Sequence, residues 1–363
     1  MAKIPLLLGV VFLILFVLFK PVQEKFLHKT NSTPTNPAIS ITKTPSLTQA
    51  PIPTVAVTPA PSNTSQVITK KILLLIFNPI IDSRDNQRLT AVLGWNNADN
   101  LAASYIADVK ESSHGIVDYQ INQRLEVDDF PILADGFDYN GTSYLACWYD
   151  HAKCHNPNGV NYQAILSTYQ VCEKLNAGEI DELWTFGGPW FGFYESVMAG
   201  QGAFWTNGPV VTGTTCNKRL HIMGFSYERT VTEMLEDLGH RSEGTMTYVF
   251  GGWNKSGESD WDKFTKIDKH NPGNSICGNV HFAPNSESDY DWSNQRIVTS
   301  NCDGWLNYPN VINSQKQINC TEWNCNARQY LKWWFLHIPH ASGQTNEKFN
   351  NWWRYIVDTN NSF

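Results

Sequence analysis

Two glutamates occupy positions where an α/β protein would place catalytic acids. Glu195 lies in the loop 187–196, GGPWFGFYES, which follows the apolar segment 181–186, and Glu228 follows the segment 221–225. Ligands of a parallel sheet bind beyond the carboxyl ends of its strands, so both side chains could reach one site. A carboxyl group among apolar rings has a raised pKa, which suits a general acid. We therefore name Glu195 and Glu228 as catalytic candidates.

Each glutamate also has an explanation that needs no catalysis. Glu195 could pair with an arginine in a packed loop, and Glu228 would be stabilised by the helix dipole in the first turn of a helix. Aromatic residues near the two glutamates are candidates for substrate contacts, because flat apolar rings stack on sugars. Packing in the core is the alternative for each ring. The binding candidates are Trp190, Tyr194 and Tyr227.

The histidines suggest a second chemistry. The segment 228–243, ERTVTEMLEDLGHRSE, is expected to be helical to about Arg241, with Gly239 near the end of the helix. A glutamate and a histidine four residues apart on a helix can ligate a metal, although the H-E-x-x-H motif is absent. A solvated helix face is the commoner meaning of such a pattern. The residues that share this polar face are Glu233, Glu236, His240 and Glu243.

Further histidines lie in the second half of the chain. One is found in CGNVHFAPN, and two flank Pro339 at the expected end of a helix. Together with a histidine from the helix 228–241, they could give three nitrogen ligands and leave one position open for water, as catalytic zinc requires. The spacing itself demands no metal, because these residues lie on separate segments. The metal candidates are His240, His281, His337 and His340, and zinc is the cofactor that this set would take.

The elements that must position these residues alternate between strand and helix patterns. This alternation predicts an α/β fold with a largely parallel sheet and flanking helices. After about residue 250, glycine and polar residues dominate, so we expect a loop-rich, disulfide-tied C-terminal part. Strands are expected at 70–81, 114–122, 181–186 and 221–225, and helices at 101–111, 162–175, 228–241 and 327–337.

Eight cysteines indicate an oxidising compartment. Their number is even and none forms a C-x-x-C pair, so disulfides are favoured over a zinc ribbon or a redox pair. Disulfides persist mainly outside the reducing cytosol. Proximity in the sequence favours Cys147–Cys154 and Cys320–Cys325 as two of the bridges.

The N-terminal region has the pattern of a membrane anchor followed by a spacer. Residues 4–19 are an unbroken apolar run, which predicts a transmembrane helix within the segment 1–29. Residues 30–68 are rich in Ser, Thr and Pro, and we expect them to form an extended, disordered stalk. Residues 69–363 then form a globular domain, which we expect outside the cytoplasm at the cell membrane.

Two observations leave alternatives to an uncleaved anchor with the domain outside the cytoplasm. Lys20, Lys25 and Lys29 follow the apolar run, and under the positive-inside rule they would place the C-terminal side in the cytoplasm. The run is also short enough that a cleaved signal peptide is an alternative, although no A-x-A pattern follows it. The outside assignment therefore depends on the stalk and the cysteines.

Composition limits the partners. The formal net charge is -7, and the lysines and arginines form no cluster, so nucleic acid is not expected as a partner. The chain contains 14 tryptophans. They either fill a large core or hold sugar rings at a surface.

Several stretches carry a resemblance to other proteins: GFYESVMAGQGAFW, IMGFSYERTVTEMLEDLGHRSE, CGNVHFAPNSESDYDW, and HIPHASG with NNWWRYIVD. They resemble uncharacterised secreted bacterial proteins of no assigned function. The resemblance covers most of the chain from Ile72 to Asp358 and implies an exported bacterial protein with one domain. It implies no activity and no functional residue.

These observations lead to two hypotheses about function. The first is a membrane-anchored extracytoplasmic hydrolase that acts on cell-surface glycan or peptide, either through Glu195 and Glu228 or through a histidine-bound metal. The alternative is a non-catalytic glycan-binding or structural surface protein. Convergence of the glutamates and histidines would favour the hydrolase. A line of exposed tryptophans would favour glycan binding, and buried tryptophans would favour a structural role.

Overall fold

A computed structural model describes residues 66–82, 85–251 and 259–363 of the chain. The expected membrane anchor and nearly all of the expected stalk lie outside these residues. In the part of the chain that the structure describes, no helix is both long and apolar enough to cross a membrane. The described residues all belong to one compact unit.

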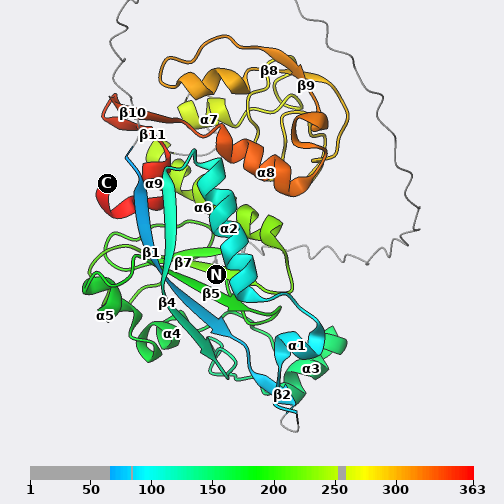
Figure 1. Cartoon of the computed structure of the whole chain (residues 1–363), viewed down its shortest axis with the longest axis vertical. Coiled ribbons are helices and arrows are strands. Elements are labelled where there is room, and N and C mark those ends of the chain that lie inside the picture. Colours follow the sequence, from blue (N-terminus) through cyan, green and yellow to red (C-terminus); the bar gives the residue numbers. More distant parts are fainter. Residues whose placement is uncertain (1–65, 83–84, 252–258) are drawn as a thin grey trace, which may run out of the picture. The chain divides into compact units, whose positions relative to one another are not determined.

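A five-stranded sheet with the strand order β4-β1-β5-β7-β6 forms the centre of this unit (Figure 1). The first four strands are parallel, and β6 pairs with β7 in the antiparallel direction. The expected α/β fold with a largely parallel sheet is therefore confirmed. The strands are β1 (Ile68–Phe77), β4 (Val117–Val127), β5 (Glu182–Gly187), β6 (Ser196–Ala199) and β7 (Leu220–Ser226).

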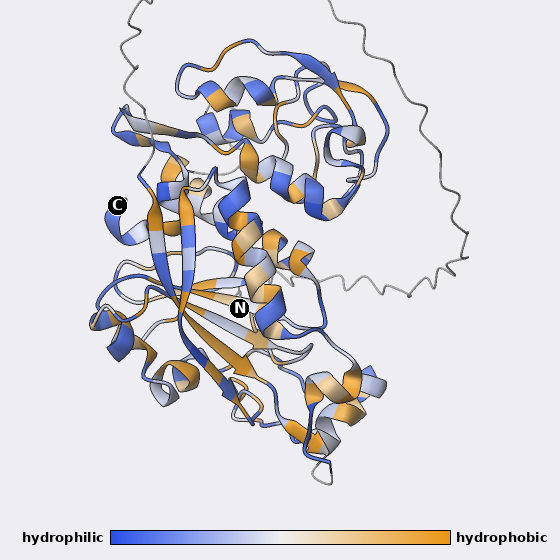
Figure 2. Cartoon of the chain, in the orientation of Figure 1, coloured by the Kyte–Doolittle hydropathy of each residue, from blue (hydrophilic) through white to orange (hydrophobic). Residues whose placement is uncertain are grey.

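The first strand is buried along most of its length. All six side chains from Ile72 to Phe77 are buried, as expected of a strand that is covered on both faces. Figure 2 shows this apolar character in the central strands. The segment 70–81, which we expected to be one strand, is divided into β1 and β2 (Ile80–Asp82). The division falls at Asn78-Pro79, because proline cannot donate to the ladder of a central strand.

Helices cover both faces of the sheet. On one face, α2 (Ala98–Ser112) packs against α6 (Val231–Phe250), and α8 (Ala327–Leu336) contacts both. Tyr105 of α2 contacts Trp184 of β5, which pairs with Leu74 of β1. Since side chains alternate along a strand, the odd-numbered residues of β1 face away from α2. On that opposite face, Tyr169 contacts Phe77 at a ring-centroid distance of 6.0 Å. Tyr169 follows directly on α4 (Tyr162–Thr168), which therefore covers the second face.

Two helix predictions need correction. The segment 162–175 is not one helix, because Gln170 has a φ of 53° and separates α4 from α5 (Val171–Asn176). Helix α6 does not end near Gly239 but continues to Phe250. A glycine inside a helix costs only about 1 kcal/mol, and packing on both sides of this helix outweighs that cost.

The start of α6 also differs from the expectation. Thr230 is the N-cap residue, and its side chain forms a capping box with Glu233. Glu228 therefore lies before the helix and not in its first turn. Glu233 belongs to the cap, which leaves Glu236, His240 and Glu243 on the polar face.

The C-terminal part after about residue 250 is loop-rich, as expected, and two of the four disulfides lie within it. Four disulfides are present, and both bridges predicted from proximity are among them: Cys147–Cys154, Cys172–Cys216, Cys277–Cys302 and Cys320–Cys325. The remaining strands and helices are β3 (Gln87–Arg88), α1 (Leu89–Leu93), α3 (Gly141–Tyr149), α7 (Asp260–Phe264), β8 (Val298–Ser300), β9 (Lys316–Ile318), β10 (His340–Thr345), β11 (Lys348–Asn351) and α9 (Trp353–Val357). Short 3-10 turns are η1 (His151–Lys153), η2 (Cys302–Asn307), η3 (Cys320–Trp323) and η4 (Thr359–Asn361).

The tryptophans mostly fill the core. Trp205 is the one tryptophan that is exposed among the described residues, at 57%. Most of the others are packed against further aromatic rings, as in the contacts of Trp261 with Trp334 and Trp352. The buried tryptophans are Trp184, Trp261, Trp305, Trp323, Trp333, Trp334, Trp352 and Trp353.

A buried ion pair joins α6 to the sheet. The guanidinium of Arg241 donates two hydrogen bonds to the carboxylate of Glu182 on β5, at 2.8 and 2.7 Å. Its Nε also donates to the carbonyl oxygen of Ile356 at 3.0 Å. Both charged side chains are almost fully buried, at 0% and 2% exposure. The pair therefore fixes how α6 and α9 lie on the sheet.

We expect Arg241→Met to lower the free energy of unfolding by about 3–5 kcal/mol, because it leaves Glu182 charged and buried without its partner. Denaturant titration measures the change. The control is Arg124→Met, which removes an exposed pair with Asp99 and should cost less than about 1 kcal/mol. Equal losses in the two variants would contradict the role given to the buried pair.

Candidate metal centre

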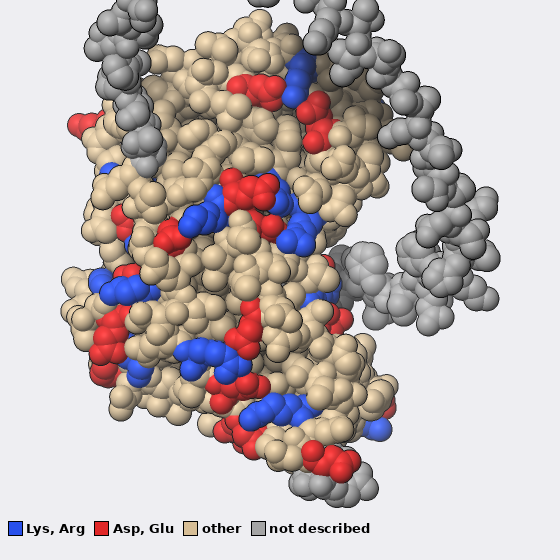
Figure 3. Space-filling view, viewed as in Figure 1, with Lys and Arg blue, Asp and Glu red and all other residues tan. Residues whose placement is uncertain are grey.

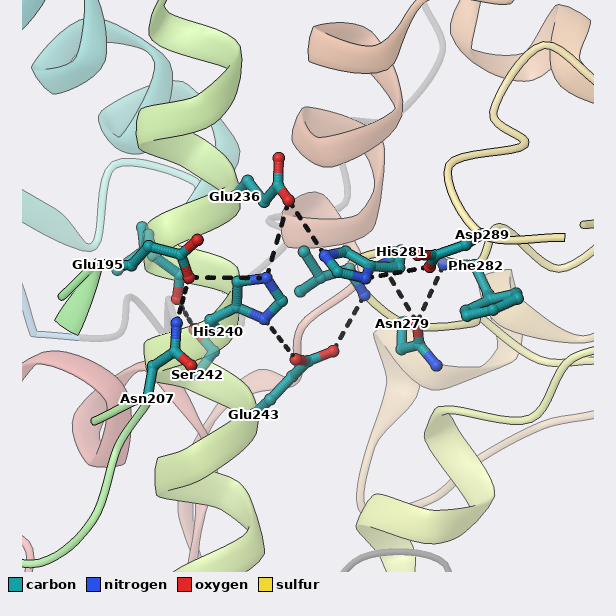
Figure 4. A network of polar contacts seen from close by, with 12 residues as sticks. Glu195, Asn207, Glu236, His240, Ser242, Glu243, Asn279, His281, Phe282 and Asp289 are labelled. Carbon is teal, nitrogen blue, oxygen red and sulfur yellow. Dashed lines mark hydrogen bonds and ion pairs between the residues drawn. The ribbon is translucent and has the colours of Figure 1, made fainter. Parts of the chain in front are cut away.

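Three side chains with metal-binding atoms converge beside the middle of α6. Glu236 and His240 lie one turn apart on α6, and His281 comes from the loop after Cys277 (Figure 4). One ligand atom from each residue lies within 4.8 Å of the other two. Both histidines direct Nε2 at the same oxygen, Oε1 of Glu236, at 3.8 Å for His240 and 3.0 Å for His281.

A second carboxylate orients each of the two histidines. His240 Nδ1 is 2.9 Å from Oε2 of Glu243, and His281 Nδ1 is 3.1 Å from Oδ1 of Asp289. In a neutral imidazole, a carboxylate at Nδ1 holds the proton on that nitrogen and leaves the lone pair on Nε2. Ligating histidines are usually held in this way by a carboxylate or a carbonyl. The two Nε2 atoms are thus prepared to bind the same ion.

Gly239 allows the loop that carries His281 to approach α6. A Cβ atom at Gly239 would lie 2.4 Å from Cγ2 of Val280, so any larger residue would force Val280 to shift. Glu243 then ties the loop to the helix, because its Oε1 accepts a hydrogen bond from the backbone N–H of Val280 at 3.1 Å. The same glutamate therefore orients His240 and positions the segment that supplies His281.

Aromatic side chains hold the loop from the other side. The hydroxyl of Tyr330 on α8 donates to the carbonyl oxygen of Asn279 at 2.6 Å. The indole N–H of Trp292 donates to the carbonyl oxygen of Val280 at 3.2 Å. The loop has no regular secondary structure of its own, so these contacts fix its position.

Glu195 lies beside the three converging residues. It directly precedes β6, and its carbonyl oxygen accepts a hydrogen bond from the N–H of Gly224 on β7 at 3.2 Å. Its Oε2 lies 3.9 Å from His240 Nε2 and accepts a hydrogen bond from the side-chain amide of Asn207. Gly244 of α6 allows this approach, because a Cβ atom there would lie 2.0 Å from the carbonyl oxygen of Thr206.

The electrostatics of the cluster favour a cation. Burial alone would raise the pKa of Glu236, but its interactions with His240 and His281 lower that pKa to about 2. Burial alone would lower the pKa of His240, but Glu236 and Glu243 raise it to about 10. Without a metal, His240 therefore carries a proton at neutral pH. A dication that binds there must displace this proton, so its binding will weaken as the pH falls.

Glu195 differs from its neighbours in charge state. Desolvation raises its pKa above the usual range, and Glu236 adds to the increase, while His240 opposes it. The side chain remains 44% exposed. A carboxylate with a raised pKa and an open side takes up a proton more readily than an ordinary glutamate.

The other catalytic candidate lies apart from this cluster. The carboxylate of Glu228 pairs with Arg229 at 3.1 Å, and among the described residues it shares no hydrogen-bond or ion-pair partner with Glu195. Tyr227, a binding candidate, is fully buried, and its hydroxyl donates to the carbonyl oxygen of Phe77 at 3.0 Å. Tyr227 therefore belongs to the core, because neither its ring nor its hydroxyl is open to a ligand.

The two remaining binding candidates lie in the loop after β5. Tyr194 is 44% exposed and precedes Glu195, so it remains accessible next to the cluster. Trp190 has a φ of 61° and contacts Trp148 and His151 at ring-centroid distances of 6.3 and 4.5 Å. Trp190 therefore packs with its neighbours, and only Tyr194 lies next to a member of the cluster.

Two of the four predicted histidine ligands also lie elsewhere. His337 is buried, with Nδ1 at 2.7 Å from the carbonyl oxygen of Trp333 and Nε2 at 3.1 Å from Asp303. His340 stacks on His114 at a ring-centroid distance of 4.0 Å. Neither belongs to the group that could hold a metal. The structure thus brings together Glu195, His240 and His281 from the predicted set, with Glu236 as a further candidate ligand.

Several residues of the site were not predicted as site residues. Glu236 and Glu243 were placed correctly on the polar face of α6, and their spacing to His240 was the signal that a ligand and an orienting carboxylate lay there. Asn207, Asp289 and Tyr290 carry no comparable signal, because they reach the site only through the folding of irregular loops.

No known protein family, curated protein or solved structure matches the chain.

We expect Gly239→Ala to weaken metal binding at least about tenfold, because the added methyl group displaces Val280 and with it His281. Calorimetric titration of the metal-free protein with zinc measures the affinity. The matched control is Gly159→Ala, since a Cβ atom there meets no other atom within 4 Å. An unchanged affinity in the folded Gly239 variant would show that the approach of this loop does not build the site.

Proposed function

We propose that the protein is a metal-dependent hydrolase in which Glu236, His240 and His281 bind zinc and Glu195 is the general base. The observation that carries the proposal is the paired orientation of the histidines. Glu243 and Asp289 each hold one Nδ1, and both Nε2 atoms point at Glu236. A solvated helix face would not require this arrangement, since exposed histidines need no carboxylate on both ring nitrogens.

The donor set supports zinc. Two imidazoles and one carboxylate are the protein ligands of a common class of catalytic zinc sites, which keep a fourth position for water. Zinc in such a site lowers the pKa of water and polarises a substrate oxygen. The side chains of Glu236 and His240 are 13% and 16% exposed, while Glu195 is 44% exposed. The ligands therefore lie deeper than the proposed base, which a substrate can reach.

Glu195 suits the role of general base by position and by charge. Its carboxylate is close to His240 Nε2, and Asn207 holds the same oxygen in place. The raised pKa allows Glu195 to accept a proton from water and to return it to the leaving group. The role proposed for Glu228 receives no support from its contacts, because its carboxylate pairs with Arg229.

The location of the domain is also a proposal. We infer that residues 4–19 anchor the chain in the cell membrane and that the described domain lies outside the cytoplasm. Four disulfides support an oxidising compartment. On the face seen in Figure 3, basic and acidic side chains lie next to one another. This intermixing offers no support for a nucleic-acid partner, which would require a continuous basic surface.

The alternative, a non-catalytic glycan-binding or structural protein, is judged by the burial of the tryptophans. A structural role is supported by the burial of most tryptophans, which removes the line of exposed rings that glycan binding would need. Burial of the tryptophans does not account for the convergence of Glu236, His240 and His281, which makes the hydrolase the better-supported proposal.

Elemental analysis of the purified full-length protein, without a histidine tag, tests the proposal. We expect about one zinc ion per chain, because the described residues contain one such set of ligands. His240→Ala and His281→Ala should each reduce the zinc content at least about tenfold. His270→Ala, at an exposed histidine outside the cluster, is the control and should leave it unchanged. Absence of zinc from the folded protein after incubation with the metal would refute the proposal.

A further inference from the structure

Tyr290 lies at the rim of the candidate metal centre in a strained conformation. Its φ is 59°, a left-handed backbone conformation that bulky residues rarely adopt. Its hydroxyl donates a hydrogen bond to Oε1 of Glu236 at 3.1 Å, and its ring lies 4.3 Å from that of His281. The residue is 46% exposed. Tyr290 therefore contacts two proposed ligands and solvent at once.

The surrounding loop maintains this conformation. The backbone N–H of Tyr290 donates to the carbonyl oxygen of His281 at 3.1 Å. The rings of Tyr290 and Trp292 pack edge to face at a centroid distance of 5.2 Å. The carboxylate of Asp291 closes the turn by accepting hydrogen bonds from the N–H of Glu287 at 3.0 Å and from Asn294 at 2.6 Å. Strain that is held in this way is found mainly at functional sites.

The charges around the centre restrict the substrate. Glu195, Glu236, Glu243 and Asp289 contribute four carboxylates, and none of them forms an ion pair with a lysine or arginine in the described part of the chain. A bound dication would neutralise two of the four charges and leave a net charge of about -2 from these groups. A phosphate or sulfate ester would meet repulsion there, because no lysine or arginine of the described residues pairs with these carboxylates to offset their charge.

We propose that the site hydrolyses an uncharged carboxylic amide and that Tyr290 donates a hydrogen bond to its carbonyl oxygen. This inference depends on the metal-dependent hydrolase proposed above. Water adds to the carbonyl carbon and gives one proton to Glu195, the C–N bond breaks, and the proton passes to the leaving nitrogen. The products are a carboxylic acid and an amine. Tyr290 keeps its proton and stabilises the negative charge that develops on the carbonyl oxygen.

The same groups fit a glycosidic bond less well. Cleavage of such a bond requires two carboxylates on opposite sides of the sugar and develops positive charge on the ring. A phenol that donates a hydrogen bond offers no stabilisation to that charge. The half-exposed hydroxyl of Tyr290 can turn from Glu236 to a substrate oxygen by rotation about its C–O bond, so a carbonyl is the group that it can recognise.

The full-length protein loaded with cobalt(II) in place of zinc allows a direct test, because the visible spectrum reports on the coordination of the ion. Acetohydroxamic acid binds metal ions and presents a carbonyl oxygen like that of an amide, and inorganic phosphate presents the oxygens of a phosphate ester. We expect acetohydroxamic acid to bind at least about tenfold more tightly than phosphate. Tyr290→Phe should weaken acetohydroxamic acid about tenfold, as expected for one lost hydrogen bond to a charged oxygen. The cobalt stoichiometry should stay the same.

The control is Tyr248→Phe, which alters another half-exposed tyrosine that stacks on Phe204 and should not change the affinity. Phosphate that binds as tightly as acetohydroxamic acid would overturn the substrate class. An unchanged hydroxamate affinity in Tyr290→Phe would overturn the role of the phenol. Failure of the unaltered protein to bind cobalt would instead refute the metal centre, and the inference would fail with it.

Discussion

The buried ion pair between Arg241 and Glu182 is the interaction on which the site most depends. Successive residues of an α-helix point about 100° apart, so fixing the direction of Arg241 also fixes that of His240 beside it. Arg241 faces the sheet and reaches Ile356, while His240 faces the loops of the C-terminal part. Glu236 and Glu243, one turn to either side of His240, share its direction. The rotation of α6 therefore decides whether a metal centre can form.

Two irregular loops bring the rest of the centre to α6. A glycine of α6 leaves room for the close approach of each loop. Gly239 admits the segment that carries His281, and Gly244 admits the segment that places Asn207 on Glu195. The first loop begins at Cys277, whose disulfide with Cys302 ties it to the C-terminal part. The site is thus a product of the whole fold and requires the sheet, α6 and the oxidised loops together.

Much of the fold could be predicted from the sequence, because the strands and long helices carry strong periodic patterns. The apolar run of β1 and the polar face of α6 are examples. The site was predictable in part: strand-end position indicated Glu195, and the spacing of residues on α6 indicated His240. His281 could be proposed only among four histidines, since sequence carries no record of which loops meet. Gly239 was misread as a helix end, because its real role is close approach to Val280, a residue 41 positions away.

The central claim is that Glu236, His240 and His281 bind one metal ion. A crystal structure of the zinc-incubated protein, with diffraction recorded on both sides of the zinc absorption edge, tests this claim most directly. We expect one strong anomalous peak between Oε1 of Glu236 and the two Nε2 atoms, at about 2.0–2.2 Å from each ligand atom. A peak held by other residues, or none at this place while His240 Nδ1 remains on Glu243, would contradict it.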